Sequence, residues 1–310
     1  MEDPAIRRER AHNLWASFGR KFPFVAKAVE LDVAPEVGTD RIGGLESAQE
    51  EIFTYACGRT DPDVYASWGT VAPTGLLLIG GHGVGKTLLA RALATRAGTA
   101  FLHVSVPRLV LEIVHGGGGA LGELLTIWSQ TLDEMPPVTV YFHELEFSQA
   151  EEIGAFRTDL PVPTIMDFLL DFVDRAIAVP SALLVASTTH PDTLRRAFIA
   201  PGRFERVVDV SPVFPDDVAR AIAIHARDAE KRAGRKLFES VDWRAVVRQS
   251  QGPSPGDWIR LMHAVLRAKA RCEVAGEPAG LVTEGDLQAE LDRFQRAQGR
   301  LPTRRLGTYA

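Results

Sequence analysis

The chain has 310 residues, of which 45% are hydrophobic and 24% are charged, and its formal net charge is −5. These proportions are those of a folded protein with one large or two modest domains, and they exclude a wholly disordered chain. The acidic balance provides no general basic surface, so binding to nucleic acid is not favoured. No apolar run approaches the roughly 20 residues that span a bilayer, and the opening residues lack the pattern of a secretory signal. With two distant cysteines, Cys57 and Cys272, we predict a reduced, cytoplasmic protein without a membrane partner.

Residues 6–21 are rich in arginine and space their large apolar side chains as a helix does. Two interpretations stay open: an arm that docks on a neighbour or recruits a partner, or a helix that caps its own domain. Residues 32–39 contain a proline and a glycine and are typical of a linker. We assign residues 1–36 to an N-terminal helical arm and linker.

Five short apolar runs alternate with helical segments between residue 41 and about residue 213. Runs of this kind, separated by helices, are typical of buried parallel strands in an α/β sheet that is covered on both faces. The pattern predicts an α/β domain over residues 37–213. The five runs are 76–79, 101–104, 138–142, 183–186 and 207–210.

After residue 215 the strand signals stop and helical periodicity takes over. The segments 216–233, 239–249, 256–274 and 286–298 all carry it. Two of them open with a capping signal, Ser254 before a proline and Thr283 three residues before Asp286. We predict a separate small helical domain over residues 214–300 and a flexible tail over residues 301–310.

The strongest motif is Gly-Gly-His-Gly-Val-Gly-Lys-Thr at residues 80–87, which matches the P-loop pattern. Glycines let backbone N–H groups close around phosphate oxygens, and the positive end of the following helix faces the same anion. In this pattern Lys86 reaches the β- and γ-phosphates and the Thr87 hydroxyl binds Mg²⁺. We therefore predict a site for ATP and Mg²⁺. Its binding residues are Gly81, His82, Gly83, Val84, Gly85, Lys86, Thr87 and Leu88.

The apolar run 138–142 ends in His143 and Glu144. A strand that ends in acidic groups beside a P-loop is where an NTPase holds its Mg²⁺ shell and the base that polarises water. We take Glu144 as the candidate base. The competing interpretation is a surface glutamate at a strand end.

With these motifs in order, the chain resembles the AAA+ superfamily, in its classical AAA branch, from about residue 40 to residue 270. Residues 42–46 are similar to the Ile-Gly-Gly-Leu segment that lies against adenine, and 254–257 to the start of the lid helix. Residues 188–192 stand where the family has Ala-Thr-Asn-Arg-Pro-Asp, and 200–206 match the second region of homology. By this resemblance further residues take part in the site: Ile42, Gly43, His225 and Gly256 at the nucleotide, Thr189 as sensor 1, and Arg203 and Arg206 as arginine fingers.

The resemblance implies a P-loop NTPase sheet followed by a small all-α lid. It also implies a homo-oligomer, a hexameric ring in which Arg203 and Arg206 reach the γ-phosphate of the neighbouring subunit. The function that it implies is an ATPase that hydrolyses Mg²⁺-ATP at subunit interfaces to remodel a protein partner or adaptor.

Three positions depart from the family pattern. His143 stands where the family has an aspartate; an imidazole can support Mg²⁺ through a bound water but brings no charge, so weaker Mg²⁺ binding and slow hydrolysis are expected. Ile113 stands at the pore-loop position that is usually aromatic, beside the glycines 116–119. Thr189 replaces an asparagine and has a shorter reach. The alternative function is therefore an ATP-binding switch or scaffold with little hydrolysis.

Overall fold

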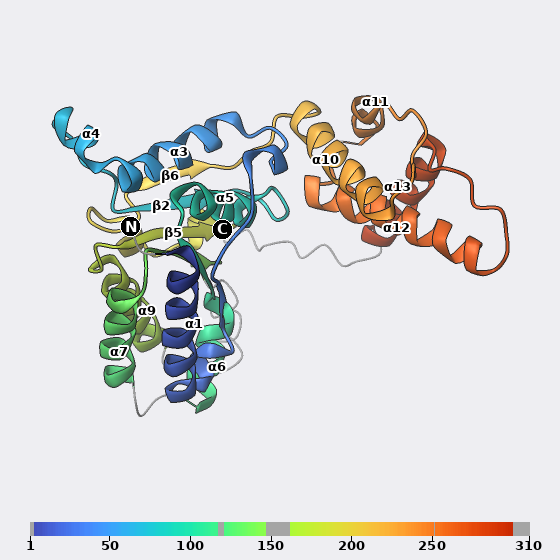
Figure 1. Ribbon diagram of the computed structural model, residues 1–310. Coiled ribbons are helices and arrows are strands. Elements are labelled where there is room, and N and C mark those ends of the chain that lie inside the picture. Colours follow the sequence, from blue (N-terminus) through green and yellow to red (C-terminus); the bar gives the residue numbers. More distant parts are fainter. Residues whose placement is uncertain (1–2, 117–120, 147–161, 251, 300–310) are drawn as a thin grey trace, which may run out of the picture. The chain divides into compact units, whose positions relative to one another are not determined.

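The computed structural model describes residues 3–116, 121–146, 162–250 and 252–299 (Figure 1). The chain forms two compact units. The first comprises Met1–Thr39, Glu46–Gly81 and Gly85–Ser211, and the second comprises Asp40–Leu45, His82–Val84 and Pro212–Ala310. Two short segments that precede residue 213 thus group with the helical part of the chain.

The first unit is built on a six-stranded sheet in the order β1-β3-β4-β5-β2-β6. All neighbouring strands are parallel except β1, which runs antiparallel to β3. The predicted α/β fold is confirmed: four of the five apolar runs lie within a strand, and the fifth, 207–210, overlaps β6 and extends one residue past it. The strands are β1 (Val29–Asp32), β2 (Gly75–Ile79), β3 (Ala100–Ser105), β4 (Val138–His143), β5 (Ala182–Thr188) and β6 (Arg206–Asp209).

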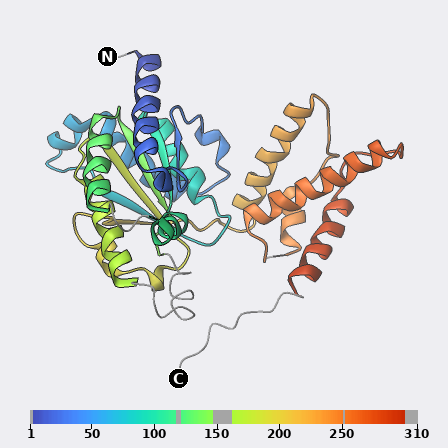
Figure 2. The same ribbon diagram turned by 90° about the horizontal axis from the view of Figure 1, so that it is seen from below.

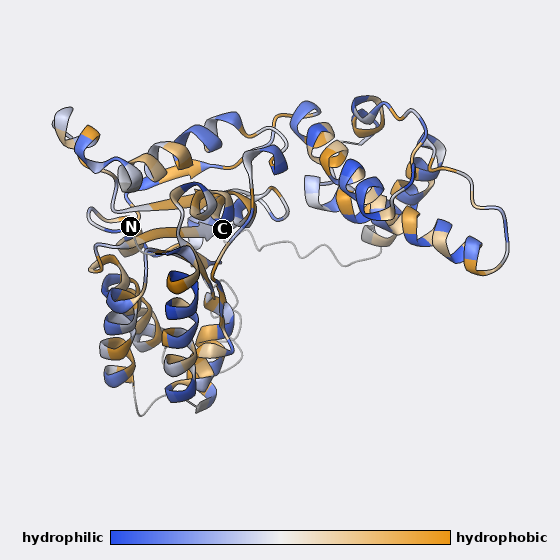
Figure 3. Cartoon of the chain, viewed as in Figure 1, coloured by the Kyte–Doolittle hydropathy of each residue, from blue (hydrophilic) through white to orange (hydrophobic). Residues whose placement is uncertain are grey.

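Helices cover both faces of this sheet (Figures 1 and 2). On one face lie α3 (Glu46–Thr60) and α5 (Lys86–Ala97), and on the other lie α1 (Pro4–Lys21), α7 (Leu121–Glu134) and α9 (Val162–Ile177). Because both faces are covered, the central strands β2 and β5 are largely apolar along their length, as Figure 3 shows. The remaining helices of this unit within the described ranges are α2 (Pro23–Ala26), α4 (Pro62–Ser67) and α6 (Val106–Gly116).

Strand β4 shows how the alternation of side chains separates the core from the site. Val140 and Phe142 are buried in the apolar cluster that also holds Phe172 of α9. Side chains of a strand alternate between faces, so Tyr141 and His143 lie on the opposite face, the one that α5 covers. That face carries polar groups at the carboxyl end of the strand.

Helix α1 packs on its own unit. Phe18 is 2% exposed and stacks with Trp15 at 5.1 Å between ring centroids, and both rings contact Trp128 of α7. The chain then enters β1, which pairs with β3 at the edge of the sheet. Of the two interpretations of residues 6–21, the contacts support a helix that caps its own domain.

The prediction of a linker from residue 32 missed β1. This strand has only four residues, two of them acidic, and it is an edge strand with one paired side. Neither the length nor the composition of such a strand produces a recognisable apolar run.

The second unit is a helical bundle around Val247, Trp258 and Met262, all of which are 2% exposed or less. The predicted caps are confirmed, because Ser254 with Asp257 and Thr283 with Asp286 form reciprocal capping boxes. Its helices are α10 (Asp216–Ala233), α11 (Trp243–Arg248), α12 (Pro255–Val274) and α13 (Glu284–Gln298).

The segment Asp40–Leu45 lies against α10 in this second unit. A Cβ on Gly43 would stand 2.3 Å from the backbone nitrogen of Ala221, so only glycine fits there. The buried carboxylate of Asp217 accepts hydrogen bonds from the backbone N–H groups of Leu45 and Val213, at 3.1 and 2.9 Å. Among the helices that the structure describes, none is long and apolar enough to cross a bilayer.

Candidate nucleotide site

The P-loop has the backbone conformation that its glycines permit. The φ angles of Gly80, Gly83 and Gly85 are 154°, 75° and 111°, in a region that side chains with a Cβ avoid. Gly85 is the N-cap residue of α5, which begins at Lys86. The loop therefore follows a buried strand and opens a helix, the context in which backbone N–H groups bind an anion.

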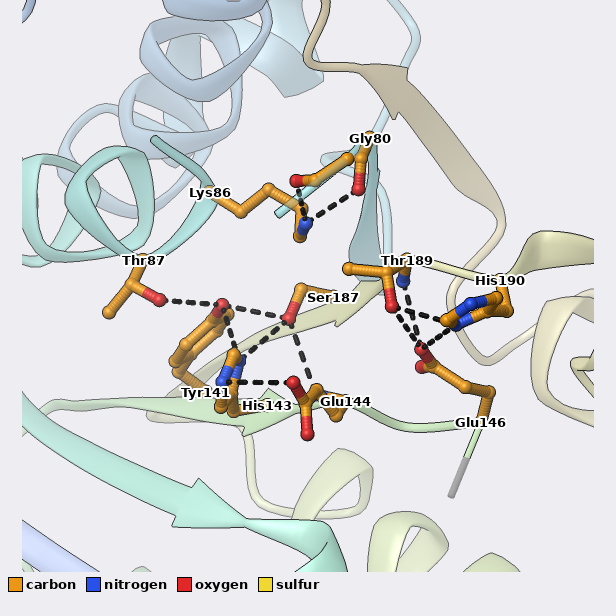
Figure 4. Close-up of polar contacts among 11 residues, drawn as sticks. Gly80, Lys86, Thr87, Tyr141, His143, Glu144, Glu146, Ser187, Thr189 and His190 are labelled. Atoms are coloured by element: carbon orange, nitrogen blue, oxygen red, sulfur yellow. Dashed lines mark hydrogen bonds and ion pairs between the residues drawn. The ribbon is translucent and has the colours of Figure 1, made fainter. Parts of the chain in front are cut away.

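Lys86 is 6% exposed, and its ammonium group lies against the loop itself. Nζ donates to the carbonyl oxygens of Gly80 and Gly81 at 2.6 and 2.7 Å (Figure 4). Burial lowers the pKa of Lys86, although the negative charges of Glu146 and Glu144 oppose that shift. The carbonyl groups thus hold a buried cation where the motif predicts a phosphate ligand.

A connected polar cluster joins the first turn of α5 to strands β4 and β5 (Figure 4). Its members are Thr87, Tyr141, His143 and Ser187. The Thr87 hydroxyl lies 3.1 Å from the Tyr141 hydroxyl, which donates to Oγ of Ser187 at 2.8 Å. Nδ1 of His143 lies 3.3 Å from the same Oγ and 3.4 Å from the Tyr141 hydroxyl. Burial raises the pKa of Tyr141 to about 12, so its phenol is protonated and can donate at neutral pH.

Glu144 follows β4 directly and has a φ angle of 55°, which is a strained conformation for a residue with a Cβ. Ser187 holds this turn on both sides: its Oγ lies 3.4 Å from the N–H of Glu144, and its carbonyl accepts from Leu145 at 2.9 Å. The Glu144 side chain is 33% exposed, and its Oε1 lies 3.7 Å from Nε2 of His143. The candidate base is therefore accessible and beside His143.

Thr189, the predicted sensor, is bound to a second glutamate. Its backbone N–H and its hydroxyl both donate to Oε1 of Glu146 at 2.9 Å (Figure 4). Burial opposes the ionisation of Glu146, yet the hydrogen bonds from Thr189 and Thr188 outweigh it and lower the pKa of this carboxyl. The Thr189 hydroxyl is thus turned toward Glu146. The negative charges of Glu146 and Glu144 both favour the protonated form of Lys86.

Arg203 and Arg206, the predicted fingers, each contact an acidic side chain of the first unit. Nε and Nη2 of Arg203 donate to the two carboxylate oxygens of Asp174 in α9, at 2.6 and 2.7 Å. Arg206 opens β6, and its Nε donates to Glu51 of α3 at 2.9 Å. Arg206 pairs with Leu76 at the start of β2, whereas the P-loop follows the other end of that strand.

The expectation that Ile113 lies on a pore loop is wrong. Ile113 is in helix α6, is 6% exposed and belongs to the apolar core of the first unit. Its spacing within the helix places it toward the sheet, whereas Leu111 and Val114 are 39% and 38% exposed. The glycines 117–119 and the tail 301–310 lie outside the described residues.

Four predicted nucleotide residues outside the P-loop belong to the second unit, as do the loop residues His82–Val84. Ile42 is buried, and the N–H of Gly256 donates to the carbonyl of Gly83 at 3.0 Å. A Cβ on Gly83 would meet Oγ of Ser254 at 2.6 Å, so this contact needs a glycine. Burial lowers the pKa of His225 in α10, and Asp228 opposes the shift. Gly43 packs against the backbone of α10 at Ala221.

Three residues of the site were missed in the sequence: Tyr141, Ser187 and Glu146. Each had a signal, because each is a polar residue within or just after an apolar run. Tyr141 and His143 are two residues apart on one strand and so share a face, and Ser187 follows the neighbouring run. What the sequence lacks is the register that brings Ser187 beside them.

The residues present fit ATP with Mg²⁺. The positive φ angles of the loop form a cradle for phosphate, and the Thr87 hydroxyl and the half-buried carboxylate of Glu144 are oxygen donors of the kind that Mg²⁺ prefers. No group of three or more His, Cys, Asp or Glu within the described ranges could hold a metal ion by itself. The ion would take most of its ligands from phosphate and water, as Mg²⁺ commonly does.

The family model and the similar proteins found by comparison all point to the same family of ATPases. Residues 76–212 match the family described as "ATPase family associated with various cellular activities (AAA)". The chain is 30% identical over 275 residues to the proteasome-activating nucleotidase of Methanopyrus kandleri, covering 86% of this chain and 58% of that protein. The corresponding nucleotidase of Methanosarcina mazei is 31% identical, with coverage of 81% and 59%.

A further relative is the ATP-dependent zinc metalloprotease FtsH of Syntrophus aciditrophicus, 29% identical over 73% of this chain and 31% of that protein. The chain spans about half the length of the nucleotidases and less of the protease. The match covers the P-loop, strand β4 with Glu144 directly after it, and the arginines 203 and 206. The chain is a member of the AAA+ ATPases, in the AAA family.

Proposed function

We propose that this protein binds Mg²⁺-ATP and hydrolyses it at the interfaces of a homo-oligomeric, hexameric ring, in order to remodel a protein partner. The observation that carries the proposal is the arrangement of Lys86, Thr87 and Glu144 at the carboxyl edge of one parallel sheet (Figure 4). Ligands of open α/β sheets bind at this edge.

Each residue has a role that its position supports. Lys86 would exchange the carbonyl groups of Gly80 and Gly81 for phosphate oxygens, and the Thr87 hydroxyl would contact Mg²⁺. Glu144 would orient a water and accept its proton. When bound, Mg²⁺ neutralises negative charge on the phosphates. Ile42, Gly43, Leu88, His225 and Gly256, with the loop residues 81–85, are proposed to hold the nucleotide, and Thr189 to sense it through Glu146.

Arg203 and Arg206 would complete the site of a neighbouring subunit. An arginine supplied in trans stabilises charge on the γ-phosphate and accelerates phosphoryl transfer by about 10³–10⁵. A single protomer would then be a poor catalyst, and turnover per protomer would rise with assembly.

A protein is the proposed substrate class because the names of the relatives, a proteasome-activating nucleotidase and an ATP-dependent metalloprotease, join nucleotide use to proteolysis. The printed sequence contains no His-Glu-x-x-His pattern, so the zinc-protease chemistry of the second relative has no counterpart in it. The apolar residues of α6 that face solvent, Leu111 and Val114, are better placed than the buried Ile113 to contact a substrate.

The test is phosphate release from Mg²⁺-ATP at several protein concentrations, with Glu144→Gln as the control variant. We expect turnover per protomer that rises with concentration and is lost in the control. Rates that are equal in wild type and control would contradict hydrolysis at this site. Turnover that does not depend on concentration across the assembly range would contradict catalysis in trans.

The second candidate is a nucleotide-dependent switch or scaffold that binds ATP and hardly hydrolyses it. His143 favours it, since an imidazole at this position adds no negative charge near the metal. Binding of ATP that drives assembly, without phosphate release above the Glu144→Gln control, would support the switch.

A further inference from the structure

The hydroxyl groups of Thr87, Tyr141 and Ser187 are hydrogen-bonded in that order, and Nδ1 of His143 lies 3.3 Å from Oγ of Ser187 and 3.4 Å from the Tyr141 hydroxyl (Figure 4). Tyr141 is fully buried and donates its only hydroxyl hydrogen to Ser187 at 2.8 Å. The Tyr141 oxygen is then an acceptor for the Thr87 hydroxyl at 3.1 Å. A hydroxyl that donates its hydrogen to tyrosine keeps its lone pairs for another ligand.

The hydrogen bonds that Ser187 accepts determine which atom its own hydroxyl hydrogen can reach, and that atom is on His143. Its Oγ receives the Tyr141 hydroxyl and faces the N–H of Glu144, so its own hydrogen is left for Nδ1 of His143 at 3.3 Å. A ring nitrogen that accepts carries no hydrogen, and in a neutral imidazole the hydrogen is then on the other nitrogen. Nε2 of His143 is the atom that lies 3.7 Å from the carboxylate of Glu144.

We propose that Tyr141 and Ser187 are positioning residues: this hydroxyl relay turns the Thr87 hydroxyl and fixes His143 with an N–H toward Glu144. The role of His143 is then to orient the base, not to replace a metal-supporting carboxylate. The proposal rests on the proposed function only in naming Glu144 as the base.

The surroundings fit a fixed relay. Ser187 is fully buried in β5, and Tyr141 is stacked against His103 at 5.5 Å between ring centroids and 16° between ring planes. A phenol clamped in this way cannot leave its partners, so the directions of the hydrogen bonds persist. Glu144 itself sits in a strained turn that Ser187 holds through its backbone and its side chain.

The first measurement is the tautomer of His143 in the full chain at pH 8 without nucleotide. Protein labelled with ¹⁵N-histidine gives the two ring-nitrogen shifts, and the His143 signals are those lost in His143→Gln. We expect the hydrogen on Nε2 in wild type, and a mixture of tautomers in Tyr141→Phe and Ser187→Ala. A hydrogen on Nδ1 in wild type would overturn the relay.

The second measurement is ATP turnover by the same two variants. We expect kcat to fall about tenfold in each, the effect of losing one buried hydrogen bond, with KM for ATP unchanged. The matched control is Tyr55→Phe, because Tyr55 is also a buried phenol with two hydrogen bonds: it donates to the carbonyl of Thr74, just before β2, and accepts from the N–H of Leu184 in β5. We expect this control to keep kcat.

The two measurements separate the failure of this inference from the failure of the proposed function. If wild type hydrolyses ATP and both variants keep its kcat, the relay does not position the base. If wild type does not hydrolyse ATP, the proposed function fails, and the tautomer of His143 with its response to Tyr141→Phe still decides whether the relay exists. An equal loss of kcat in Tyr55→Phe would show a general effect of losing a buried hydroxyl and would overturn the positioning role.

Discussion

Arg203 donates two hydrogen bonds to the carboxylate of Asp174, from Nε and Nη2. Its Nη1 donates a third to the carbonyl of Ala197 at 2.7 Å. The side chains are 26% and 41% exposed, so the pair lies near the surface of the first unit. Hydrogen bonding to Asp174 raises the pKa of Arg203 and keeps it charged. Of the five N–H groups of a guanidinium, these contacts use three. Under the proposed function, these contacts would hold Arg203 oriented toward a neighbouring subunit.

We therefore expect Asp174→Asn to lower the turnover of the assembled protein by about tenfold, because a loose arginine must be ordered again in every encounter. ATP affinity should be unchanged. The measurement is phosphate release at saturating protein concentration, and Asp167→Asn is the control, since Asp167 lies on the same helix and pairs with the exposed Arg195 at 3.0 Å. A rise in turnover would instead identify the Asp174 contact as a restraint on the arginine.

Replacement of Lys86 should abolish tight nucleotide binding. In Lys86→Met the phosphates lose a cation, and the carbonyl groups of Gly80 and Gly81 lose their donor. We expect the Kd for a fluorescent ATP analogue to rise at least about tenfold, measured by titration. Lys27→Met is the control, because Lys27 is an exposed lysine paired with Glu112. Unchanged affinity in Lys86→Met would contradict phosphate binding at this loop.

Helix α1 should contribute to the stability of its unit through Phe18. Phe18→Ala removes a ring that is 2% exposed and packed against Trp15 and Trp128, and we expect a loss of about 3–5 kcal/mol in the free energy of unfolding. Urea denaturation followed by tryptophan fluorescence measures it. Ile6→Ala on the same helix, at a side chain that is 56% exposed, should change it by about 0.5 kcal/mol or less. Equal effects would indicate an arm that is not docked on its own unit.

Much of the fold could be predicted from the sequence because its signals are local. The five parallel strands are short apolar runs, and the helices of the second unit follow apolar periodicity between capping residues such as Ser254 and Thr283. Strand β1 could not be predicted, since its four residues become a strand only by pairing with β3. The grouping of His82–Val84 with the second unit also depends on contacts that no local pattern contains.

The residues of the site also fall into two groups, those that a local motif marks and those that depend on contacts between strands. Lys86, Thr87 and Glu144 are marked by motifs, whereas Glu146 and Ser187 acquire their roles from neighbouring strands. Ile113 was misplaced because a position in an aligned segment does not determine burial. The apolar periodicity of α6 places that side chain in the core, and burial of an isoleucine is favoured by about 1.5–3 kcal/mol over exposure.

His103 should make stability depend on pH. Burial, and then the proximity of His143 and Arg91, lower the pKa of His103 to about 4 from 6.5, although Glu30 opposes the shift. Its folded-state pKa lies below the unfolded value, so the unfolded chain binds the proton more readily. The contribution to stability is complete above pH 6.5 and is lost as the pH falls toward 4.

The test is urea denaturation of wild type and His103→Phe between pH 4 and 7.5. Phenylalanine keeps a ring that stacks with both Phe101 and Tyr141 and removes the nitrogen Nε2, which is buried without a hydrogen-bond partner among the described residues. We expect the stability of the variant relative to wild type to rise steadily as the pH falls from 6.5 to 4. A constant difference between His103→Phe and wild type over this range would show that His103 binds its proton equally well in the folded and unfolded chain.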